Sequence, residues 1–188
     1  MNLGFRTHSE AQDILKIYGI YIKIILLVCL PAFSATQRAP EFQVKAAFLF
    51  NFSKFVEWPA KSFSTPYDPF IVGIYGNDPF GRFIDETIKG ETAFGRPMHV
   101  ERVRNVQDAV KCQILFINTP GKTAEILNAV KGLGILTVGQ DPNFCSMGGI
   151  IRFYKEKDMV RLEINVQAAK ESNIDISSKL LRISKVYR

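Results

Sequence analysis

Apolar residues recur at helical spacing in the segment from about Phe42 to Glu57. At about 100° per residue, six of them fall within about 140° of one another, a stripe typical of a helix packed on a core. These six are Val44, Phe48, Leu49, Phe52, Phe55 and Val56. Because a residue that precedes proline is biased away from the helical region, the helix is expected to end near Trp58, before Pro59. Phe50 falls on the other side, so it is expected either to be covered by a later part of the chain or to be exposed.

Strand-like apolar runs and helical patterns alternate in the middle of the chain. Unbroken apolar runs are typical of strands buried on both faces of a parallel sheet. Strands of this kind are therefore expected at residues 70–75, 114–117 and 135–138, and residues 98–103 are also expected to form a strand. Helices are expected to begin near Asp78–Pro79, Val106 and Thr119–Pro120. Repeated strand–helix–strand units predict a mostly parallel sheet with helices on both faces.

The pattern changes towards the end of the chain, where residues 150–154 and 159–166 are expected to form an antiparallel hairpin. Gly148–Gly149 precedes it and permits a tight bend. In the second strand one expected face is apolar, with Val160, Leu162, Ile164 and Val166. The other face is polar, with Arg161, Glu163 and Asn165. A last helix, capped near Ser177, carries Leu180, Leu181, Ile183 and Val186. The sequence predicts a single-domain α/β sandwich with a mostly parallel central sheet and a C-terminal antiparallel hairpin.

The start of the chain has the pattern of an export signal. Basic residues precede a short apolar run at 24–30, and small residues close it near Ala35, as in a cleaved secretory signal peptide. The run is much shorter than the roughly 20 residues of a membrane span. Counting from Ile17 lengthens it, and an uncleaved anchor is then the alternative. We expect a signal peptide at 1–35, a folded domain at 36–188 and a location outside the cytoplasm.

The distribution of charged residues and the few metal-binding or nucleophilic side chains restrict the classes of function that this chain can have. The net charge of +6 is spread along the chain without a block of like charge, so a solvated basic surface is favoured over nucleic-acid binding. His99 is the one histidine of the expected domain, and a lone histidine on a strand is more often structural than a ligand. With His99 and two separated cysteines there is no spacing for a zinc site and no catalytic constellation. Neither a metal, a cofactor nor an enzymatic activity is expected.

One turn could bind a small anion. Asn77 and Asp78 lie where the first expected parallel strand leads into a helix, the edge at which open α/β sheets bind ligands. Amides at the start of a helix could hold an anion there, and Arg96 could supply a second contact. The simpler interpretation is a strand-to-helix turn capped by Asp78.

The two cysteines of the expected domain are not expected to pair. Cys112 lies just before one strand, 114–117, and Cys145 lies beyond the end of another, 135–138. In parallel strands these positions are at opposite edges of the sheet, whereas a disulfide needs Cα atoms within about 7 Å. Cys112 and Cys145 are therefore expected to be free or to form intermolecular bonds.

Six segments together resemble the YfiR/HmsC-like family of bacterial periplasmic proteins. They are 44–59 (VKAAFLFNFSKFVEWP), 76–81 (GNDPFG), 112–117 (CQILFI), 148–153 (GGIIRF), 162–165 (LEIN) and 177–181 (SSKLL). The resemblance spans nearly the whole expected domain, and its first block is long enough to be specific.

This resemblance implies a regulator in the periplasm. Similar proteins bind the periplasmic region of an inner-membrane diguanylate cyclase and lower its cyclic-di-GMP output, which restrains biofilm formation. A peptidoglycan-binding outer-membrane lipoprotein can relieve this repression, and some relatives form homodimers. Relatives often carry a cysteine around Gly73 as the partner of the one at Cys112. Here that position is glycine, so the resemblance implies that Cys112 has lost its partner.

The leading hypothesis is thus a protein that binds and represses a membrane cyclase. Phe50 and Trp58, which lie off the core stripe, are the candidate contact residues, because aromatic residues dominate interface energetics. The alternative for both is burial under the C-terminal helix. The second hypothesis is a periplasmic sensor of small anions that uses Asn77, Asp78 and Arg96.

Overall fold

The computed structural model describes residues 40–188. The signal peptide expected at 1–35 lies outside these residues. No helix within residues 40–188 is both long enough and apolar enough to cross a membrane.

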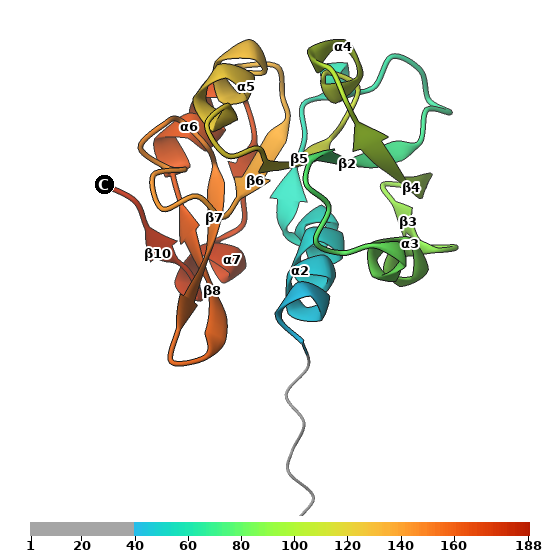
Figure 1. Cartoon of the computed structure of the whole chain (residues 1–188). Coiled ribbons are helices and arrows are strands. Elements are labelled where there is room, and N and C mark those ends of the chain that lie inside the picture. Colours follow the sequence, from blue (N-terminus) through green and yellow to red (C-terminus); the bar gives the residue numbers. More distant parts are fainter. Residues whose placement is uncertain (1–39) are drawn as a thin grey trace, which may run out of the picture. The chain divides into compact units, whose positions relative to one another are not determined.

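The strands of the described region form one eight-stranded mixed sheet and one two-stranded antiparallel sheet. In spatial order the large sheet contains β10 (Lys185–Val186), β8 (Met159–Ile164), β7 (Ile151–Glu156), β6 (Leu136–Gly139), β5 (Ile114–Asn118), β2 (Phe70–Gly76), β4 (Arg96–Val103) and β3 (Thr92–Ala93). The small sheet pairs β1 (Val56–Glu57) with β9 (Asp175–Ile176). Figure 1 places β10 at one side of the molecule and β3 and β4 at the other.

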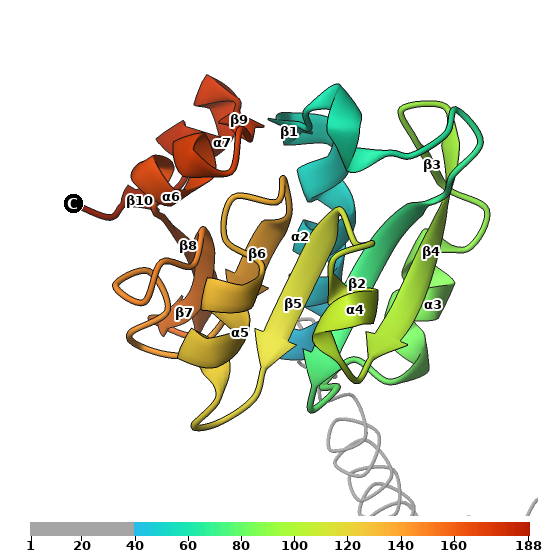
Figure 2. The same cartoon turned by 90° about the horizontal axis from the view of Figure 1, so that it is seen from above.

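The four central pairs of the large sheet, β4–β2, β2–β5, β5–β6 and β6–β7, are parallel, as the alternating pattern predicted. The helices are α2 (Glu41–Phe55), α3 (Arg82–Ile88), α4 (Val106–Ala109), α5 (Thr123–Ala129), α6 (Val166–Glu171) and α7 (Ser178–Arg182), with a short 3₁₀ turn, η1 (Ala60–Ser62). Figure 2 shows α4 and α5 in front of the sheet and α2 behind it. The α/β class is therefore confirmed.

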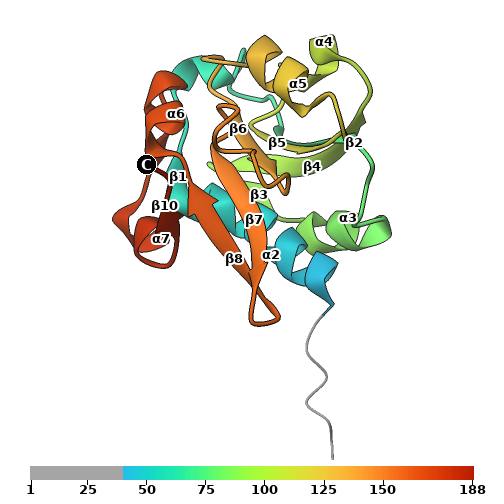
Figure 3. The ribbon, with the colours of Figure 1, turned by 60° about the vertical axis from the view of Figure 1, so that its left-hand side comes forward.

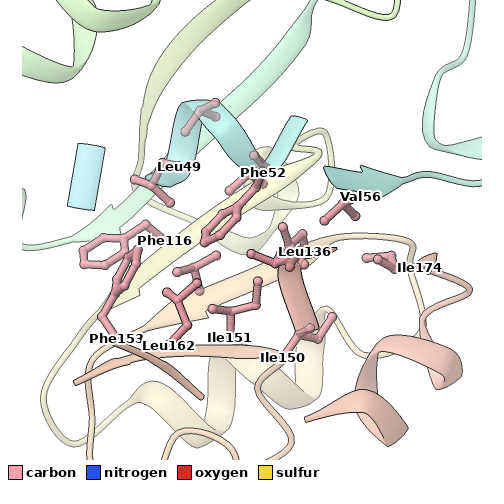
Figure 4. Packing of buried hydrophobic residues seen from close by; sticks show 14 of the residues in the cluster. Leu49, Phe52, Val56, Phe116, Leu136, Ile150, Ile151, Phe153, Leu162 and Ile174 are labelled. Carbon is pink, nitrogen blue, oxygen red and sulfur yellow. The ribbon is translucent and has the colours of Figure 1, made fainter. Parts of the chain in front are cut away.

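Alternate residues of the strands serve two hydrophobic clusters, one on each face of the sheet. Val72 and Ile74 of β2 belong to the larger cluster, which includes residues of α2 and α3. Ile71 of the same strand belongs to the smaller cluster, together with residues of α4 and α5. Figure 4 shows the larger cluster, in which Phe52 of α2 lies near Phe116 of β5.

Helix α2 follows the predicted stripe but ends earlier than expected. Leu49 and Phe52 are fully buried, and Val56 is 2% exposed. The expectation that the helix reaches Glu57 is wrong, because Val56 and Glu57 pair with β9 as strand β1 instead. Helix α2 is thereby connected, through β1, to a strand near the carboxyl terminus.

The β7–β8 pair is antiparallel and its connection turns at Lys157 and Asp158, whose φ angles are +48° and +60°. Two left-handed residues in a two-residue connection match the right-handed twist of paired strands. Figure 3 shows this pair projecting from the body of the domain.

Two expectations near the end of the chain are wrong: the extent of the second hairpin strand and the extent of the last helix. Glu163 and Asn165, on the polar face of the second hairpin strand, are buried, and both are held by hydrogen bonds inside the fold. Val166 does not continue the strand but begins α6, whose first turn is capped by the Asn165 side chain. Helix α7 ends at Arg182, so Ile183 and Val186, expected on the apolar face of a longer helix, are 63% and 42% exposed.

Candidate functional site

The turn after β2 is held by hydrogen bonds from its backbone to the carboxylate of its own residue Asp78. Oδ1 of Asp78 accepts hydrogen bonds from the backbone N–H of Phe80, at 2.7 Å, and of Gly81, at 3.2 Å. Helix α3 begins at Arg82, not at Pro79 as expected, since these residues form a turn around Asp78 first. The amides that could have held an anion are therefore already occupied.

The cation beside this turn is Arg102 of β4. Its Nε lies 3.0 Å from Oδ2 of Asp78, and its Nη2 donates to Oδ2 of Asp85, at 2.8 Å, and to the carbonyl of Gly81, at 2.6 Å. These hydrogen bonds from Arg102 hold the pKa of the Asp85 carboxyl below its ordinary value. The register pairs Tyr75 with Val103, which brings Arg102 to this edge. Sequence reasoning missed it because that register was not known.

Arg96, the expected second contact for an anion, lies at the opposite end of the same strand. Its Nη1 donates to the carbonyls of Thr65, at 2.8 Å, and Asp68, at 2.7 Å, and its guanidinium lies 3.9 Å from the ring centre of Phe63. The structure does not bring Arg96 to the turn at Asn77 and Asp78. Its contacts instead hold the connection that precedes β2.

Asn77 belongs to a chain of polar side chains along the carboxyl edge of the parallel strands. Its carbonyl accepts from Nδ2 of Asn118, at 2.9 Å, and Oδ1 of Asn118 accepts from Nε2 of Gln140, at 3.3 Å. Oε1 of Gln140 in turn accepts from Nζ of Lys45, at 2.7 Å, and Lys45 also pairs with Glu41. Lys45 is only 8% exposed. This edge is where open α/β sheets bind ligands, and here the chain's own side chains occupy it.

The two aromatic residues proposed as contacts are both half-buried, and they have different surroundings. Nε1 of Trp58 donates to the carbonyl of Gln113, at 2.9 Å, and its ring packs edge-on against Phe70, at 5.0 Å between centroids. Phe50 lies on α2 and packs at the margin of the larger cluster, with Nζ of Lys54 4.2 Å from its ring centre. Trp58 thus holds the segment after α2 against Gln113, just before β5, and against Phe70 of β2.

The residues with metal-binding or nucleophilic side chains do not converge. His99 is exposed on β4, and no group of three metal-ligating side chains forms within residues 40–188. Cys112 and Cys145 are free thiols, each 2% exposed. Burial raises the pKa of each thiol to about 12, so both are protonated and unreactive at neutral pH.

A surface that sequence reasoning missed lies at the carboxyl end. Ile183 is 63% exposed, Val186 42% and Tyr187 36%. Residues 178–188 also carry four basic side chains and no acidic one: Lys179, Arg182, Lys185 and Arg188. We call this surface, formed by residues 178–188, the C-terminal patch. Exposed apolar side chains are typical of interaction sites, and the basic residues beside them in the sequence favour an acidic partner.

Glu163 fixes the strand that carries part of this patch. Its carboxylate accepts from Nε of Arg152, at 2.7 Å, and from Nζ of Lys185 in β10, at 2.8 Å. Burial opposes its ionisation, but these hydrogen bonds outweigh that effect and keep the pKa of Glu163 below its ordinary value. The ion pairs therefore help to hold β10 against β8.

We expect Glu163→Gln to lower the free energy of unfolding by about 2 kcal/mol at pH 7, because Arg152 is left without its charged partner. A carboxyl group whose pKa is lower in the folded state than in the unfolded state contributes its full stabilisation above the unfolded pKa of about 4.3. This contribution is lost as the pH falls through the pKa of the folded state. The difference between variant and parent should thus shrink below about pH 4. Urea unfolding across pH 3–7 measures it. The control is Glu156→Gln, whose carboxylate is 57% exposed; an equal effect there would contradict the assignment.

A family model described as YfiR/HmsC-like matches residues 42–185. The chain belongs to the YfiR/HmsC-like family. No curated protein matches it. The match covers the α/β domain from α2 to β10, including the segments quoted above and the C-terminal patch up to Lys185. The family is a regulatory rather than a catalytic one, and membership suggests a periplasmic regulator in cyclic-di-GMP signalling. Such regulators of the YfiR/HmsC-like family work through a protein partner.

Proposed function

We propose that this protein binds the periplasmic region of an inner-membrane diguanylate cyclase and holds the enzyme in its less active state. The family match over residues 42–185 carries this proposal. In physical terms, the protein shifts the cyclase towards the state that it binds more tightly, in proportion to the difference in affinity. A peptidoglycan-binding lipoprotein would relieve the repression by competing for the protein.

The structure supports protein binding over the sensing of a small anion. The amides of the turn at Asp78 are bound to its own carboxylate, and Arg96 lies at the other end of β4. The C-terminal patch, in contrast, offers exposed apolar and basic side chains together. We assign this patch as the main contact surface for the cyclase, with the half-buried rings of Phe50 and Trp58 as further contacts.

The experiment is affinity capture from an extract of periplasm and membranes, with mass spectrometry to identify the retained proteins and cellular cyclic-di-GMP as the second readout. A membrane diguanylate cyclase should be retained, and cyclic-di-GMP should rise when the protein is deleted. Retention of no cyclase, together with unchanged cyclic-di-GMP, would overturn the proposal.

Charged substitutions in the C-terminal patch test the contact surface. Ile183→Asp and Tyr187→Asp are expected to weaken cyclase capture about tenfold or more, because a buried carboxylate would face the partner. Both side chains are exposed, so the midpoint of thermal unfolding should change little. The matched control is Met159→Asp, a substitution at another exposed apolar residue (44%) outside the patch. Equal capture by all three variants would exclude this surface.

A further inference from the structure

Strand β4 leaves most of one edge of the large sheet open. Beyond it lies only β3, which pairs with Arg96 and Pro97. The backbone N–H of Met98 still points outward, because it donates to the carbonyl of Glu91 at 3.0 Å. Backbone groups of a strand alternate in direction, so those of Val100 and Arg102 also point away from β2. These groups have no backbone partner in the part of the chain that the structure describes.

A groove of about 910 Å³ runs beside this open edge, between β4 and α3. Figure 2 shows β4 as the outer long strand, with α3 beside it. Ile88, Pro97, Met98 and Val100 supply the apolar part of its lining. An open strand edge next to an apolar groove fits an extended peptide, whose backbone pairs with the strand while every second side chain enters the groove.

The charged part of the groove selects the peptide. Four carboxylates and two basic side chains line it: Asp85, Glu86, Glu91, Glu101, Arg82 and Lys89. Asp85 is paired with Arg102, and the other three carboxylates form no ion pair within residues 40–188. The groove is therefore acidic on a chain whose net charge is +6. Its charge complements a basic segment.

We propose that the β4 edge binds an extended segment of a partner protein, in which basic and apolar residues alternate, as an added strand. On the face of β4 that meets α3, the segment's apolar residues pack on Val100; on the other face, its basic residues lie beside Glu101. This inference rests on the proposed function, because it requires a protein partner. A second copy of this chain is a poorer occupant, since edge-to-edge pairing would bring two acidic grooves together.

The test uses the full chain and an acetylated, amidated hexapeptide of alternating lysine and valine. Fluorescence anisotropy measures its binding against that of a hexapeptide of alternating glutamate and valine. The lysine peptide should bind about tenfold more tightly or better, and its affinity should fall as salt is added. Amide hydrogen exchange should slow at Val100 and Arg102 on binding. Equal affinity for both peptides, or unchanged exchange at β4, would overturn the site.

Two sets of variants separate the backbone from the charges. Val100→Pro removes an outward N–H without removing a bond to β2, and should weaken the lysine peptide about tenfold. Glu101→Lys should weaken it as well, whereas Glu125→Lys on α5, outside the groove, should not. If thermal unfolding shows that Val100→Pro does not fold, the charge variants alone test the added-strand site.

The failure of this site is distinguishable from failure of the proposed function. Loss of peptide binding with cyclase capture retained would overturn the added-strand site only. Self-association of the full chain that Val100→Pro abolishes, measured by sedimentation, would assign the edge to a homodimer instead and also overturn it.

Discussion

Gly149→Ala is expected to lower the free energy of unfolding by about 3 kcal/mol, because the new methyl group would overlap a buried ring. A Cβ at Gly149 would lie 2.2 Å from Cδ1 of Phe144, and a Cβ at Gly139 would lie 2.2 Å from Cε2 of the same ring. Phe144 is fully buried, so it cannot move aside into solvent. The ring is thus clamped between two stretches of backbone that both need glycine. Chemical denaturation of Gly149→Ala and Gly139→Ala measures the effect.

The matched control is Gly148→Ala, one residue earlier. Its Cβ would meet nothing within 4 Å, but its φ of +93° favours glycine, so only about 1 kcal/mol should be lost. The double variant Phe144→Ala, Gly149→Ala should be less destabilised than the two single effects combined, since the methyl group then has room. Equal losses for Gly148→Ala and Gly149→Ala would show that backbone conformation, rather than the ring, sets the requirement.

Gly73→Cys is expected to form a disulfide with Cys112 and to raise the free energy of unfolding by about 3 kcal/mol under oxidising conditions. A Cβ at Gly73 would lie 2.5 Å from Sγ of Cys112, so the two side chains would meet in the core beside β2 and β5. Under reducing conditions the same contact becomes a clash, and the variant should be less stable than the parent by about 2 kcal/mol. Urea unfolding with and without reductant measures the expected gain and the expected loss in free energy of unfolding. A linked peptide pair in mass spectrometry identifies the disulfide bond.

Gly73→Ala provides the control for this pair. It should be destabilised in both redox conditions, because its methyl group meets Cys112 but cannot bond to it. Adding Cys112→Ala should restore part of the loss, while Leu115 remains close at 3.0 Å. If the two thiols of Gly73→Cys stay unpaired under oxidising conditions, the closeness of position 73 to Cys112 would be refuted. The relation between Gly73 and Cys112 implied by the family resemblance thus becomes a measurable property of this core.

The parts of the fold that follow from local pattern were predictable. The parallel strands read as apolar runs because both of their faces are covered, and α2 shows its stripe because one face meets the core. Alternation in β8 indicated which residues share a face but not whether that face is covered. The sequence therefore did not show that Arg152 and Lys185 enclose Glu163. Pairing partners distant in sequence leave no local signal.

The candidate site was harder to predict for the same reason. Arg96 and Arg102 are both arginines of one strand, and only the register with β2 shows which of them reaches the turn at Asp78. The C-terminal patch depends on where α7 ends, and five residues of helix give too short a pattern to fix that point. The glycines around Phe144 are required because a Cβ at either position would overlap the ring. From the sequence alone, glycines indicate only where the chain can bend.

The pairing of β1 with β9 has a consequence for the order in which the chain can fold. Val56 pairs with Ile176, and the backbone N–H of Ser177 donates to the carbonyl of Phe55 at 2.9 Å. As the chain emerges during synthesis, the segment after α2 must wait for nearly all the remaining residues before it can be fastened. A premature stop codon shortly before Asp175 would therefore remove only a short tail from the sequence but would release both ends of the domain.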